Sequence, residues 1–153
     1  VLRVDGSQHM ALGGEDVETL IRTPEISMAA SDVASCPSVR RALVALQQKI
    51  AAGCDVVMDG RDIGTRVLPD ADYKFFLTAS DKVRAQRRYD ELKAKGESVT
   101  LQEVLEDVRR RDEQDTTRAE SPLTIADDAT EVETDDLGID EVVTVLMALM
   151  GRF

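Results

Sequence analysis

Residues 55–79, DVVMDGRDIGTRVLPDADYKFFLTA, decide the fold prediction because they place two short apolar runs on either side of a charged turn. The runs at 55–59 and 73–79 are rich in β-branched and aromatic residues, which is typical of buried strands. In open α/β sheets, ligands bind beyond the carboxyl ends of the strands. We therefore expect Arg61 and Asp62, in the turn DGRD, to lie at a ligand site. A turn whose charges are merely solvated is the alternative, and the spacing leaves both interpretations open.

Helical patterns alternate with the predicted strands. A helix-like segment covers 23–36, and a second helix begins at Pro37 and ends near Gly53. Ser80 is expected to cap a helix that Gly96 closes, and Thr100 begins a capping-box pattern that starts another helix. Residues 129–134 form a further predicted strand, 139–150 form a closing helix, and 1–17 form two short strands around a glycine turn. This alternation predicts a parallel α/β sheet.

Composition excludes several classes of protein. The chain has 153 residues, a net charge of −11 and no apolar run long enough for a membrane span. An acidic chain is poorly suited to binding a nucleic-acid polymer, which requires a basic face. Cys36, Cys54 and the lone His9 are too few for a disulfide scaffold or a zinc site. We expect a cytoplasmic protein.

Arginines gather in two further segments. On a helix, Arg111, Asp115 and Arg118 share one face, which would offer two cations to an anion and a carboxylate to hydroxyl groups. Arg84 and Arg88 are also four residues apart and share a face. Ion pairs on a solvated helix are the usual explanation of such runs. Several arginine clusters in an acidic chain nevertheless favour convergence on phosphate.

These motifs together resemble bacterial cytidylate kinase. The resemblance rests on IRTPEIS, AASDVA and PSVRRAL, then DGRDIGTRVLPDADYKFFLTAS, RAQRRYDEL and RRRDEQDTTRAESPL, which follow one another in the family's order. It implies an α/β fold of the P-loop nucleoside monophosphate kinase type, with a parallel sheet, incomplete here, and helices on both faces. It also implies a small substrate-binding insert. Residues 1–33 would be part of the CMP-binding insert, and 34–153 the C-terminal part of the kinase core, with a lid region at about 80–118.

The resemblance also implies an activity and a set of site residues. The family transfers the γ-phosphoryl group of ATP, with Mg²⁺, to CMP or dCMP and forms CDP or dCDP. The complete protein would be a monomer with no protein ligand identified for Mg²⁺. By position, the implied residues are Arg61, Arg111 and Arg118 for phosphate, sugar and catalysis, Ser31, Arg40 and Asp62 for the cytosine side, Asp115 for the sugar, and Arg84 and Arg88 as lid arginines over ATP.

One family motif is absent from the sequence. No G-x-x-x-x-G-K-[ST] loop, which holds the ATP phosphates, occurs in the 153 residues. We therefore expect a fragment that lacks about 60 residues, or two βα units, and that does not transfer phosphate by itself. Two alternatives stay open. A non-catalytic pyrimidine nucleotide-binding module would bind CMP without an effect of ATP, and an interaction protein with purely structural ion pairs would bind no nucleotide.

Overall fold

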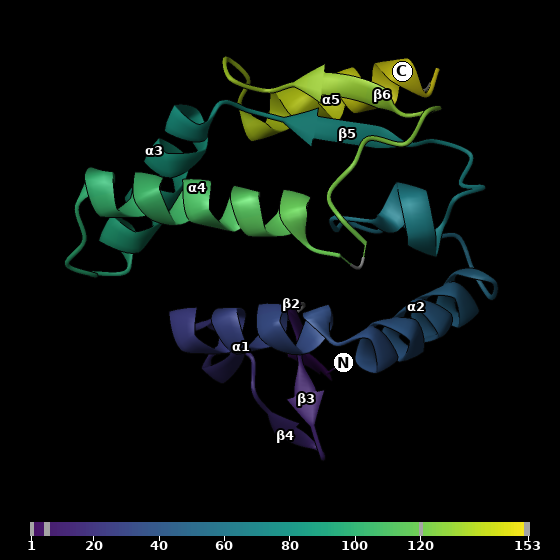
Figure 1. Cartoon of the computed structure of the whole chain (residues 1–153), viewed down its shortest axis with the longest axis horizontal. Helices are drawn as coiled ribbons and strands as arrows, with labels where there is room; N and C mark the ends of the chain where they lie inside the picture. The colour runs from purple at the N-terminus through teal and green to yellow at the C-terminus, as the bar shows by residue number, and fades with distance from the viewer. Residues whose placement is uncertain (1, 5–6, 120, 152–153) are drawn as a thin grey trace. The chain divides into compact units, whose positions relative to one another are not determined.

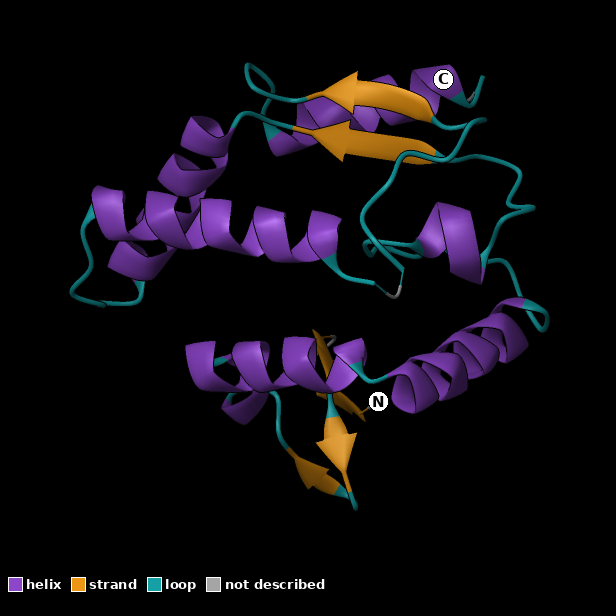
Figure 2. Cartoon of the chain, in the orientation of Figure 1, coloured by secondary structure: helices purple, strands orange, loops and turns teal. Residues whose placement is uncertain are grey.

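The structure is a computed structural model that describes residues 2–4, 7–119 and 121–151. It divides the chain into two compact units, Val1–Leu46 and Gln47–Phe153, which are described separately below. Figure 1 labels the helices and strands, and Figure 2 distinguishes them by colour. The domain division at residues 33 and 34, expected from the sequence, stays a prediction.

The first unit begins with two small antiparallel hairpins. The first pairs β1 (Leu2–Val4) with β2 (Ser7–His9), and the second pairs β3 (Ala11–Leu12) with β4 (Glu15–Asp16). Gly13 and Gly14, between β3 and β4, both have positive φ (61° and 91°), as a type I′ hairpin turn requires. The prediction of only two strands was therefore wrong, because the glycine pair closes a hairpin of its own.

Helices complete the first unit. They are η1 (Leu20–Arg22), α1 (Pro24–Ser35) and α2 (Pro37–Ala51), and the boundary between the units falls within α2. The Thr23 side chain accepts a hydrogen bond from the backbone N–H of Ile26 (3.3 Å), and a proline follows at the first helical position. Both features are typical helix starts, which explains why this helix was predictable.

The second unit contains a parallel pair of strands. The strand β5 (Phe75–Thr78) pairs with β6 (Thr130–Glu133), and Phe75 lies opposite Thr130. Between them the chain forms α3 (Asp81–Ala94) and α4 (Leu101–Thr117), and α5 (Ile139–Leu149) follows β6. The expected parallel α/β arrangement is thus confirmed for these two strands (Figure 2).

Residues 55–59 depart from the prediction of a buried strand. They run as irregular chain, and the side chain of Val57 is fully exposed. A strand is stabilised by backbone hydrogen bonds to a neighbouring strand, and none of the strands in the described chain pairs with this segment. The strand assignment was wrong because the composition of a segment does not supply its pairing partner.

A helix hairpin supplies the main core of the second unit. Ala85, Leu92 and Val104 are buried between α3 and α4. Gly96 (φ 81°) closes α3, with its N–H bonded to the Lys93 carbonyl at 3.0 Å. The partly buried residues packed against this core are Tyr89, Val99, Leu105 and Val108. In the described part of the chain, no helix combines the length and apolar character needed to cross a bilayer.

Candidate functional site

The turn after residues 55–59 places Arg61 next to a buried carboxylate. Asp62 is only 3% exposed, and its backbone carbonyl accepts hydrogen bonds from the N–H groups of Arg66 (2.9 Å) and Val67 (3.2 Å). The second bond spans five residues and belongs to a single π-helical turn, η2 (Ile63–Val67). Such turns often occur at functional sites.

A side chain at position 60 would crowd Ile63. A Cβ atom there would lie 3.0 Å from Cγ1 of Ile63 and 3.1 Å from its Cδ1. The backbone at Gly60 can therefore pass close to the Ile63 side chain, which forms part of η2. A Cβ atom at position 60 would therefore require the Ile63 side chain to shift by a few tenths of an ångström.

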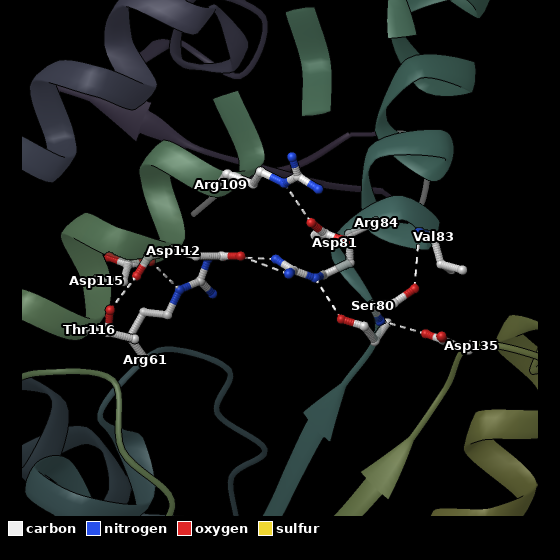
Figure 3. A network of polar contacts seen from close by, with 11 residues as sticks. Arg61, Ser80, Asp81, Val83, Arg84, Arg109, Asp112, Asp115, Thr116 and Asp135 are labelled. Atoms are coloured by element: carbon white, nitrogen blue, oxygen red, sulfur yellow. Dashed lines mark hydrogen bonds and ion pairs between the residues drawn. The ribbon is translucent and has the colours of Figure 1, made fainter. Parts of the chain in front are cut away.

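The helix α4 supplies the carboxylate to which Arg61 binds. Nε of Arg61 donates to Oδ2 of Asp115 at 2.7 Å, across 54 residues of sequence (Figure 3). Asp115 is buried, whereas 43% of the Arg61 side chain is exposed. A buried carboxylate needs charged or hydrogen-bonding partners, so this ion pair connects the turn firmly to α4.

Arg118 approaches the same carboxylate from the end of α4. Its Nη1 lies 3.6 Å from Oδ1 of Asp115, and its Nε donates to the backbone carbonyl of Ser121 at 2.6 Å. The backbone N–H of Leu123 returns to the Asp115 carbonyl (2.7 Å). Two guanidinium groups therefore converge on Asp115.

Ser121 was not singled out from the sequence, although it orients Arg118. It is 5% exposed, with φ of 52°, and among the described residues it is the one non-glycine residue with positive φ. Non-glycine residues in this region are uncommon and concentrate at functional sites. The Ser-Pro dipeptide at 121–122 indicates a turn, but it does not indicate that the serine carbonyl faces an arginine.

A second cluster of ion pairs joins α3 to α4 (Figure 3). Nη1 and Nη2 of Arg84 donate to the two carboxylate oxygens of Asp112 at 2.8 and 2.7 Å. Nε of Arg109 donates to Asp81 at 2.6 Å. The hydrogen bonds that Arg84 donates to Asp112 raise the pKa of Arg84, and the hydrogen bond that Asp81 accepts from Arg109 lowers the pKa of Asp81. Asp112 and Asp81 were not predicted, because pairing between helices has no signature within either helix.

The remaining predicted residues belong to α3 and α4 or to the first unit. Arg88 pairs with Glu91 on the exposed side of α3 (3.1 Å), and Arg111 is exposed with no ion pair to a described residue. Ser31 and Arg40 belong to the first unit, and the side chain of Ser31 lies outside the described part of the chain. Their roles stay predictions.

Arg87 lies in the same sequence run as Arg84 and Arg88, and its side chain forms hydrogen bonds within the protein. Its guanidinium donates to the Thr134 hydroxyl (3.2 Å) and to the carbonyls of Thr134 and Leu137. It thereby connects α3 to the segment that follows β6. Three neighbouring arginines of one helix consequently have three different environments.

Comparison with known proteins identifies relatives over nearly the whole chain. A family model described as cytidylate kinase matches residues 2–152. A cytidylate kinase of Caldanaerobacter subterraneus subsp. tengcongensis is 54% identical over 142 residues, which are 93% of this chain and 63% of that protein. A cytidylate kinase of Carboxydothermus hydrogenoformans is 51% identical over 148 residues, 97% of this chain and 67% of that protein. The chain thus spans roughly two thirds of the length of these curated relatives.

Proposed function

Because the chain belongs to the cytidylate kinase family, we propose that it provides the acceptor side of an enzyme that phosphorylates cytidylate. The proposed reaction transfers the γ-phosphoryl group of ATP to CMP or dCMP and releases CDP or dCDP. The protein would have the P-loop nucleoside monophosphate kinase fold of its family. A cytoplasmic location and a monomeric complete protein stay predictions.

The convergence of Arg61 and Arg118 on Asp115 is the observation that carries this proposal. Phosphoryl transfer requires mainly positioning and stabilisation of negative charge. Asp115 holds two guanidinium groups close together, which reduces the entropy that they lose when an anion binds. Arg61 keeps much of its side chain exposed, and Arg111 is exposed on the same helix as Asp115. In this proposal Arg61 and Arg118 bind the phosphate of CMP, while Arg111 and Asp115 contact the sugar.

Asp62 is proposed to favour cytosine over uracil. Cytosine carries an amino group where uracil carries a carbonyl oxygen, and a carboxylate can accept a hydrogen bond only from the former. Asp62 is buried beside Arg61, where an unmatched carbonyl would be costly. Ser31 and Arg40 are proposed to complete the recognition of the base.

ATP and Mg²⁺ belong to the donor side, for which Arg84 and Arg88 are proposed. ATP supplies the phosphoryl group, and these arginines would lie along its length and help to exclude water. Among the described residues, no group of three His, Cys, Asp or Glu side chains is arranged to hold a metal ion. We propose that Mg²⁺ arrives with the ATP phosphates, and we assign it no protein ligand.

Calorimetric titration of the chain with CMP and with UMP tests the acceptor proposal. Replacing Arg118 by alanine should weaken CMP binding at least about tenfold, since charge-assisted hydrogen bonds to phosphate are lost. Arg110→Ala is a matched control, because Arg110 is an exposed arginine of α4 that pairs with Asp107. No CMP binding by the unsubstituted chain, or equal losses in the two variants, would contradict the acceptor role. Equal affinity for CMP and UMP would contradict the role of Asp62.

A further inference from the structure

The guanidinium of Arg84 is fixed from two directions. Its Nε donates to the carbonyl of Ala79, just after β5, at 2.8 Å. Its two Nη atoms donate to the two oxygens of Asp112, 28 residues further along the chain (Figure 3). A bidentate pair of this kind defines the plane of the guanidinium as well as its position.

Asp112 lies three residues before Asp115 on α4. The two carboxylates therefore face similar directions on one helix, and each holds an arginine from another element: Arg84 from α3, and Arg61 from the turn before η2. The buried contacts between α3 and α4 make this helix a rigid support. The helix α4 thus positions Arg84, which is proposed for the donor side, and Arg61, which is proposed for the acceptor side.

The hydrogen-bonding fork of Arg84 is occupied, but the side chain stays accessible. It is 38% exposed and lines an open hollow of about 430 Å³. Because Asp112 and Ala79 take three of its N–H groups, the surface that Arg84 can offer to a ligand consists of its planar faces and its two outer N–H groups. The orientation of that plane therefore decides what Arg84 can contact.

We propose that Asp112 is a positioning residue that holds Arg84 in one orientation for the donor nucleotide. Asp112 does not touch the nucleotide itself, and its carboxylate acts only through Arg84. An ordered guanidinium loses less side-chain entropy on binding than a mobile one. This inference rests on the proposed function, which assigns Arg84 to ATP.

NMR observation of the Arg84 Nε–Hε group, combined with ATP titration of the 153-residue chain, tests the inference. In the unsubstituted chain this group should give a sharp, slowly exchanging signal that shifts when ATP is added. Asp112→Asn should broaden the signal and weaken ATP binding about tenfold, with CMP affinity unchanged. Asp112→Glu keeps the carboxylate and should recover part of the ATP affinity. Asp107→Asn, a similar change at an exposed ion pair of α4, should alter neither property.

The outcomes separate this inference from the acceptor proposal. If CMP and ATP both bind but ATP leaves the Arg84 signal unchanged, the acceptor function stands and the role of Asp112 is wrong. If Asp112→Asn lowers ATP and CMP affinity equally, together with the melting temperature, Asp112 is structural and the inference is again wrong. If CMP does not bind while ATP binding depends on Asp112, the inference stands and the acceptor proposal fails.

Discussion

At the scale of single residues, the backbone of Ser121 is the most strained feature beside the candidate site. Left-handed backbone costs an L-residue about 1–2 kcal/mol, and β-branched residues tolerate it least. Ser121→Val should therefore lower the free energy of unfolding by about 1–2 kcal/mol, measured by urea denaturation. Since the Ser121 carbonyl accepts from Arg118, CMP affinity should also fall. Ser98→Val, at an exposed loop position, should change stability by less than about 0.5 kcal/mol; equal effects would contradict the strain argument.

The sequence predicted some site residues better than others for a physical reason. The proximity of Arg118 and Asp115 could be predicted because helical spacing alone places them on one face. In the structure, Nη1 of Arg118 lies 3.6 Å from Oδ1 of Asp115. Bringing Arg61 to the same carboxylate required the family resemblance, because that pair spans 54 residues. Asp112 was not predicted because its partner, Arg84, lies on another helix. The sequence of neither helix indicates that the two residues pair.

At the scale of elements, the start of α4 should make stability depend on pH. The Thr100 hydroxyl and then its backbone N–H donate to Glu103, and both bonds lower the pKa of Glu103 below its ordinary value of 4.5. A lowered folded-state pKa contributes stability above the unfolded-state pKa, and that contribution is lost as the pH falls through the folded-state pKa.

The acid side of the stability profile checks this expectation. Urea denaturation of Glu103→Gln should show a smaller loss of stability than the unsubstituted chain as the pH falls from about 6 to about 3. Glu106→Gln is the comparison, since Glu106 lies one turn later on the same helix and accepts a hydrogen bond from the Gln102 side chain at 2.7 Å. Identical acid profiles for the unsubstituted chain and Glu103→Gln would show that the capping box adds nothing to this pH dependence.

Helices were easier to predict than strands because their signals are local. Thr100 forms the capping box, Ser80 caps α3 through the N–H of Val83 (3.3 Å), and Gly96 closes that helix, as the sequence indicated. Residues 55–59 carry equally clear strand composition, yet pairing depends on a distant partner. The same argument explains why β5 and β6 were correctly predicted, since each finds the other.

At the scale of the whole molecule, the net charge of −11 makes local arrangement more important than total charge. In the proposed function, an anionic nucleotide would meet an unfavourable overall field, and its binding would depend on arginines that carboxylates already hold in place. The ion pairs of Arg61, Arg84 and Arg109 all join segments distant in the sequence. Ion pairs of this kind fix the orientation of each arginine side chain, while part of that side chain stays exposed to solvent.

The second unit exposes apolar side chains that should bind a hydrophobic dye. Leu77 of β5 is 52% exposed and Ile139 of α5 is 85% exposed, and both line the hollow beside Arg84. Exposed apolar surface of this kind binds hydrophobic dyes and promotes association. We expect the chain to bind the dye ANS at neutral pH, and Ile139→Lys to reduce the fluorescence about twofold or more. Leu12→Lys changes a comparably exposed leucine (75%) of the β3–β4 hairpin in the first unit and should have a smaller effect. A larger decrease for Leu12→Lys would place the dye on the first unit and contradict this prediction.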